Sequence, residues 1–132
     1  MEAQIVTYRA PSGSNFAASV GLLVSRAAAN LKEVALLTDP LVEPLGVVVD
    51  ADDVNGGKVM VCIAGPCQVI AGDAISGATA TTLMAGAASR AFVFAATADR
   101  FQVGKAVMDR LSAVAAGDVI DIIVNIVGPL DT

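Results

Sequence analysis

The chain has 132 residues, a length typical of one domain with a core of its own. Apolar residues make up 55% of it and charged residues 16%, against about 25% in typical soluble domains, so we expect the protein to associate with copies of itself or with another protein. The net charge is −5 and the eight basic residues are scattered singly, which argues against a nucleic-acid-binding stripe.

The N-terminal residues predict a strand followed by a loop. Gln4 to Arg9 alternates as a strand does, and the following stretch is rich in Pro, Ser and Gly. The start of the chain lacks the basic region of a signal peptide, and the uncharged runs are too broken for a membrane span. We therefore expect a protein made in the cytoplasm. The strand and the loop after it predict an N-terminal arm at 1–15, followed by a single β domain at 16–132.

Short β-forming runs recur through the rest of the chain. Strands are predicted at 20–24, 34–37, 45–49, 58–64, 67–70, 82–84, 91–95, 103–108 and 119–127. Gly65 and Pro66 are expected to turn the chain between the fourth and fifth of these runs, and a helical turn near 26–30 is too short to be stable alone. Together these signals favour a mainly β fold, a compact small β-barrel or sandwich with an extended N-terminal arm and at most short helices.

Two near copies of one stretch predict sharp corners. Val69 to Ile75 and Val114 to Ile120 both read Val-x-Ala-Gly-Asp-x-Ile. Gly reaches the positive φ of a tight turn, and Asp bonds its own nearby backbone. The residues predicted to form these structural turns are Gly72, Asp73, Gly117 and Asp118.

The sequence indicates neither catalysis nor a cofactor. It contains no His, which removes the commonest general base. Cys62 and Cys67 are predicted to be free thiols, because zinc needs about four ligands and a disulfide needs an oxidising compartment. The acidic run at 50–53 has Asn55 and Val61 where a calcium-binding EF-hand needs Gly and Glu. We expect no enzyme and no metal site.

The order of several short motifs resembles that of a known family. Gly46-Val47-Val48-Val49-Asp50 is followed by Ile63-Ala64-Gly65-Pro66 and the first Gly-Asp stretch, and Val103-Gly104-Lys105-Ala106 precedes the second. This order, over about Leu45 to Val127, is similar to that of the small capsid cement, or head decoration, proteins of tailed bacteriophages.

The resemblance implies a β-tulip-like structural protein of the virion. Such a protein binds the outer surface of the icosahedral head, as a homotrimer at threefold or quasi-threefold positions, and stabilises the expanded shell against internal DNA pressure. Its partners are the major capsid protein and itself, with no nucleic acid, membrane or cofactor. Because an N-terminal arm in such proteins often adds a strand to the capsid protein, capsid binding is assigned to Gln4, Ile5, Val6, Thr7, Tyr8 and Arg9.

Two alternatives stay open at this point. The strand at 4–9 needs a sheet edge, which its own domain can supply as well as another chain can. The protein as a whole has an alternative function as a homo-oligomeric β domain that binds a small molecule or carbohydrate. Such sites usually use stacked aromatic rings, and the chain has no Trp, one Tyr and four Phe.

Overall fold

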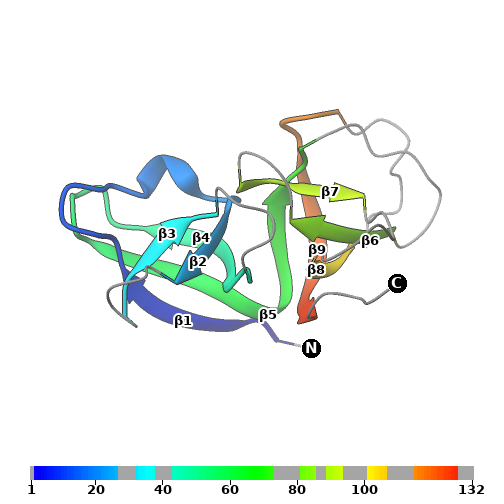
Figure 1. The fold of residues 1–132 in the computed structure, drawn as a ribbon, viewed down its shortest axis with the longest axis horizontal. Coiled ribbons are helices and arrows are strands. Elements are labelled where there is room, and N and C mark those ends of the chain that lie inside the picture. The colour runs from blue at the N-terminus through cyan, green and yellow to red at the C-terminus, as the bar shows by residue number, and fades with distance from the viewer. Residues whose placement is uncertain are drawn as a thin grey trace.

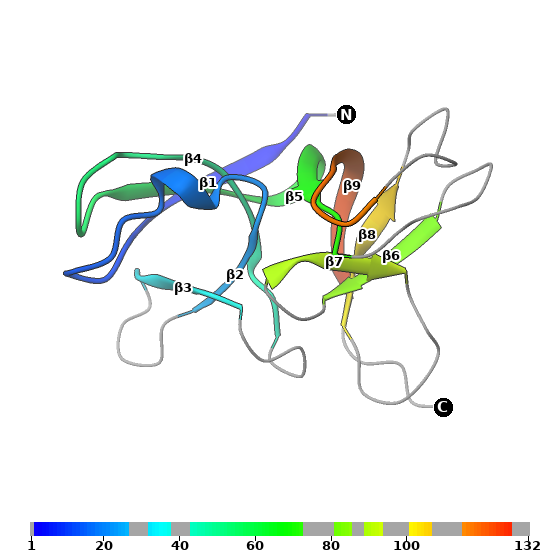
Figure 2. The same cartoon turned by 90° about the horizontal axis from the view of Figure 1, so that it is seen from above.

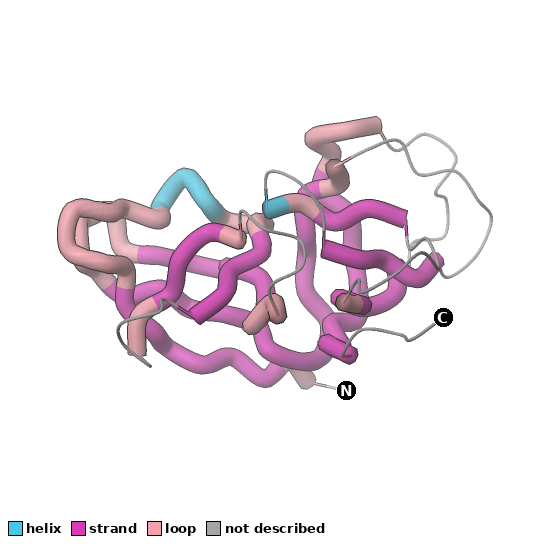
Figure 3. The backbone as a smooth tube through the Cα atoms, in the orientation of Figure 1, coloured by secondary structure: helices cyan, strands magenta, loops and turns pink. Residues whose placement is uncertain are grey.

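A computed structural model describes residues 2–26, 32–37, 43–72, 81–85, 89–93, 101–106 and 115–127. These residues form nine strands and one turn of 3-10 helix, η1 (Ala17–Ser19) (Figures 1 and 3). The strands are β1 (Gln4–Arg9), β2 (Leu23–Arg26), β3 (Val34–Leu36), β4 (Gly46–Ala51), β5 (Lys58–Ile70), β6 (Thr81–Ala85), β7 (Ala91–Val93), β8 (Gln102–Ala106) and β9 (Val119–Val127).

All nine strands belong to one antiparallel sheet, so the prediction of a mainly β fold is confirmed. Their order is β3-β2-β4-β5-β9-β8-β6-β7, and β1 pairs with β5 beside this path. No helix among the described residues is long and apolar enough to cross a membrane. The sheet curls so strongly that it forms two groups of strands, β1 to β5 and β5 to β9, which share β5 (Figure 1).

The course of β5 corrects the sequence prediction of two strands separated by a Gly-Pro turn. β5 is continuous from Lys58 to Ile70, and Gly65 and Pro66 pair with Val124 and Ile123 of β9. Gly65 has φ +92°, a conformation that suits glycine, so the strand bends here without reversing. The bend lets the first half of β5 pair with β1 and β4 and the second half with β9.

The first five strands close into a ring. β1 pairs with β5, and β5 leads through β4 and β2 to β3. The ring closes where Arg9, the last residue of β1, forms an isolated parallel bridge with Glu33, just before β3. At this point the backbone N–H of Arg9 donates to the carbonyl oxygen of Lys32 at 2.8 Å. Figure 2 shows these strands curled around a common interior.

The interior of this ring holds one of two hydrophobic clusters. Its buried members come from β2, β3, β4, β5 and the segment after β1: Ala10, Phe16, Val24, Val34, Val48, Val59 and Val61. Tyr8 of β1 packs against them and is partly buried. Apolar side chains from every strand of the ring therefore meet inside it, which stabilises the closed arrangement.

The second cluster lies between the ring and the other strands. Leu23, Val47 and Cys62 belong to it, while their neighbours Val24, Val48 and Val61 belong to the first cluster. Because successive side chains of a strand point to opposite faces, this part of the sheet is buried on both faces. A strand with one face in water alternates apolar and polar residues, whereas a strand buried on both faces is apolar throughout. Burial on both faces therefore explains apolar runs such as Val47-Val48-Val49.

The first and last strands have their predicted bounds, whereas the bounds of several others differ from the prediction. β9 spans the predicted 119–127, whereas the strand predicted at 20–24 is found as Leu23–Arg26. Gly21, with φ +91°, turns the chain between η1 and β2, which is why the strand begins later. Most of the helical turn suggested near 26–30 lies outside the described residues.

Candidate interaction surface

The predicted capsid-binding residues Gln4 to Arg9 form a strand that is already paired. β1 runs antiparallel to β5, from Gln4 opposite Ala64 to Arg9 opposite Lys58. The chain's own domain therefore supplies a sheet partner, which is one of the two alternatives that the sequence left open. What β1 offers to another molecule in this arrangement is its side chains, because five of the six residues are exposed.

One end of β1 borders an apolar groove at the junction of the two groups of strands. The groove has a volume of about 330 Å³. Its residues come from β1 and the residue before it, the segment after η1, β4, the bend of β5 and the start of β9: Ala3, Ile5, Val20, Gly21, Val48, Val49, Pro66, Cys67, Gln68 and Val119. Ile5 and Val20 are each 45% exposed and Val119 is 53% exposed. Of the described residues that line it, none is charged, so the groove suits an apolar contact.

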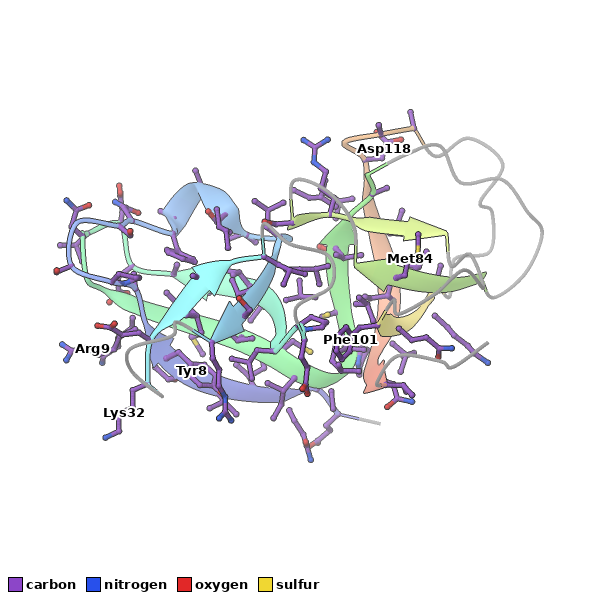
Figure 4. The ribbon with its side chains drawn as sticks, in the orientation of Figure 1. Tyr8, Arg9, Lys32, Met84, Phe101 and Asp118 are labelled. Carbon is purple, nitrogen blue, oxygen red and sulfur yellow. The ribbon has the colours of Figure 1, made fainter. Side chains whose placement is uncertain are left out.

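The other end of β1 is cationic. Arg9 lies directly across the strand pair from Lys58, and both side chains are exposed. They line a hollow of about 380 Å³ together with Thr7, Tyr8, Lys32, Asp52, Gly56 and Gly57. Figure 4 shows Arg9 and Lys32 at the same end of the ring, pointing away from it. The scattered basic residues of the sequence are thus partly gathered by the fold.

The two Gly-Asp stretches lie beside each other, a contact that the sequence did not predict. Ile70 pairs with Val119, the backbone N–H of Ala71 donates to the carbonyl oxygen of Asp118 at 2.8 Å, and the N–H of Gly117 donates to the carbonyl oxygen of Ala71 at 2.8 Å. The two similar stretches of sequence are therefore also in contact in the folded protein.

At the second corner, the side chain of Asp118 bonds nearby backbone. Its Oδ2 accepts the N–H of Ala115 at 2.9 Å, and Gly117 has φ +92°. At the first corner Gly72 lies in a bend, while Asp73 lies outside the described residues. Figure 4 shows Asp118 at one extremity of the second group of strands. The hydrogen bonds of Asp118 and Gly117 with Ala71 connect the end of β5 to the start of β9.

Cys62 and Cys67 are free, as the sequence predicted. Cys62 is fully buried, and its Sγ donates to the carbonyl oxygen of Ala64 at 3.3 Å. Burial raises the pKa of the Cys67 thiol, and the nearby Cys62 raises that pKa further. Both effects favour the neutral thiol, which is the poor nucleophile. Among the described residues, no group of three or more potential metal ligands is found.

The fold has a counterpart among solved structures. No family model matches the chain, and no curated protein matches it either. The structure is similar to the crystal structure of the head fiber gp8.5 N base in bacteriophage phi29, with a TM-score of 0.63 and 21% sequence identity. The match covers 92% of this chain and 95% of that chain, so the likeness in fold includes both groups of strands.

Proposed function

We propose that this protein is a structural component of a bacteriophage head. The observation that carries the proposal is the likeness in fold to a phage head fibre base over nearly the full length of both chains. The order of the short motifs in the sequence supports it separately, because it resembles that of head decoration proteins. The two comparisons rest on different properties, backbone geometry and residue identity.

The surface chemistry supports a binding role without catalysis. The low charged fraction and the exposed Ile5, Val20 and Val119 favour contact with other protein surfaces. Burial raises the pKa of the Cys67 thiol and keeps it neutral, so Cys67 does not supply an activated nucleophile. A non-enzymatic, structural role fits these features.

In finer terms, we propose a decoration protein on the outer surface of the head. It binds the major capsid protein, as a trimer at threefold or quasi-threefold positions, and strengthens the expanded shell against DNA pressure. Because β1 is paired within its own sheet, the capsid contact proposed for Gln4 to Arg9 uses their exposed side chains. β1 pairs with β5 along one edge, and among the described residues only Arg9 contacts another segment along the other edge, so β1 can also add to a capsid strand without leaving β5.

The test is co-sedimentation of the purified protein with heads of its own phage that lack it. Expanded heads should bind the protein in a fixed ratio and should then resist heating or dilution better than bare heads. Light scattering of the free protein should give three times the mass of one chain. A monomer with no affinity for expanded heads would contradict the proposal.

A further inference from the structure

Three of the eight basic residues meet at one end of the ring, although they are far apart in the sequence. Arg9 ends β1, Lys58 begins β5, and Lys32 is joined to Arg9 through its carbonyl oxygen, which accepts the N–H of Arg9 at 2.8 Å. All three side chains are exposed and line the same hollow of about 380 Å³. The pairing of β1 with β5 and the closure of the ring bring them together.

The stability of the fold does not account for this arrangement. Arg9 and Lys58 are direct cross-strand partners, and like charges in that relation destabilise a strand pair. Across the part of the chain that the structure describes, no carboxylate forms an ion pair with either side chain. Asp52 lines the same hollow, but its Oδ2 accepts the backbone N–H of Lys58 at 3.4 Å.

The local charge is opposite in sign to that of the whole protein. Glu33 lines an adjoining hollow, so among the described residues that line the two hollows three cations face two carboxylates, a balance of +1 in a chain of net charge −5. An acidic partner is therefore repelled by the protein as a whole and attracted at this end of the ring. Such a contrast orients a partner during encounter and fixes the register of the contact.

We propose that this cationic end, defined by Arg9, Lys32 and Lys58, is a docking site for a carboxylate-rich protein segment. Arginine forms paired hydrogen bonds with a carboxylate, and the lysines add point charges around it. A duplex nucleic acid is a poor fit, because it is held through many phosphate contacts along an extended basic surface, and this end of the ring is a short one. The inference rests on the proposed function and places the segment on the outer surface of the phage head.

The first experiment compares charge reversals at two places. Lys58→Glu and Arg9→Glu should weaken binding to heads by about tenfold or more, and Lys58→Arg should retain it. Lys105→Glu is the matched control, because Lys105 is exposed on β8 in the other group of strands. This control should bind within about twofold of the original protein. The affinity of the original protein should fall as salt is raised, and that dependence should be weaker in Lys58→Glu.

Stability separates lost docking from lost folding. Lys58→Glu places an acid opposite Arg9 across the strand pair, so its melting temperature should be close to that of the original protein. Arg9→Glu also faces Glu33 across the isolated bridge, so its binding is compared at a temperature where it is fully folded. The expected signature is therefore weaker binding without lower stability. Equal binding by Lys58→Glu, Arg9→Glu and Lys105→Glu would overturn the docking site, while the proposed function would stand.

A second experiment needs no phage particle. A labelled peptide of ten glutamates should bind the original protein at low salt, bind Lys105→Glu equally, and bind Lys58→Glu much more weakly. A DNA duplex added as competitor should not displace the peptide. Displacement by the duplex, or equal peptide binding by all three proteins, would overturn the inference. Peptide binding with no affinity for heads would instead contradict the proposed location of the acidic segment, and with it the proposed function.

Discussion

The two groups of strands differ in how their outer strands end. In the first group, β1 pairs with β5 and reaches β3 through the Arg9–Glu33 bridge, so the ring closes on itself. In the second group, the described path of strands ends at β7, which pairs with β6. The closing contact involves only the last residue of β1, so among the described residues the rest of that outer edge still offers backbone groups to another chain, as does the outer edge of β7. β1 therefore completes the ring and is part of the folded domain.

The two groups of strands also differ in where the residues of their hydrophobic clusters come from. The cluster inside the ring draws on the ring's own strands, whereas the second cluster combines Leu23, Val47 and Cys62 of the ring with Val103, Ile120 and other residues of the second group. The second group therefore covers a face of the ring. We infer that the ring retains much of its interior without the second group, while the second group depends on the ring.

Deletion of residues 1–9 should have the largest effect. It removes the six residues paired with β5 and opens the ring at Glu33, so we expect a loss of about 3 kcal/mol or more. Chemical denaturation measures the change, and adding a peptide of residues 2–10 should restore part of the stability. A truncated protein that melts as before would show that β1 does not hold the ring together and would favour the free-arm alternative.

Gly65→Ala should be the next most damaging change. Gly65 has φ +92°, and an added Cβ would lie 2.6 Å from the carbonyl oxygen of Glu2 and 2.8 Å from the Cα of Ala3. Strain and collision together should cost about 3 kcal/mol. Gly13 and Gly117 also have positive φ but nothing within 4 Å of such an atom, so alanine there should cost about 1 kcal/mol. Equal losses at the three sites, measured by urea unfolding, would contradict a special role for the bend.

Ser89→Ala tests the contact between the two groups. Ser89 lies just before β7, is 3% exposed, and its hydroxyl donates to the carbonyl oxygen of Leu37 at 2.8 Å. Losing this bond should cost about 1–2 kcal/mol. Hydrogen exchange should show weaker protection in both groups if they unfold together. Ser89→Gly loses the same bond but relieves the φ of +61°, so it should be no less stable than Ser89→Ala.

The smallest expected effect is a pH dependence at Cys67. Burial raises the pKa of this thiol above its ordinary value of 9.0, so the folded protein keeps it neutral where the unfolded chain ionises. Stability should therefore be unaffected by this group below about pH 9 and should fall as the pH rises further. Cys67→Ala should lose less stability than the original protein between pH 8 and pH 10. The difference should stay under about 1 kcal/mol, because the thiol retains some contact with water. Parallel losses in the two proteins would contradict the shift.

The sequence by itself determined the local structure where a residue pattern suits only one kind of element. The alternation at 4–9 and the β-branched run at 119–127 gave strands with the observed bounds. The prediction of a turn at Gly65 and Pro66 was wrong, because these two residues suit a bent strand as well as a turn. Pairing with β9 selects the bent strand. The free state of the two cysteines also followed from composition.

Only the tertiary structure decided which strands meet. Closure of the ring at Arg9 and Glu33, contact between the two Gly-Asp stretches and the gathering of Arg9, Lys32 and Lys58 all join residues that are distant in the sequence. Such pairings depend on the register and curvature of the whole sheet, which local patterns do not encode. For the same reason three of the eight basic residues, scattered along the chain, meet at one end of the ring when the sheet curls.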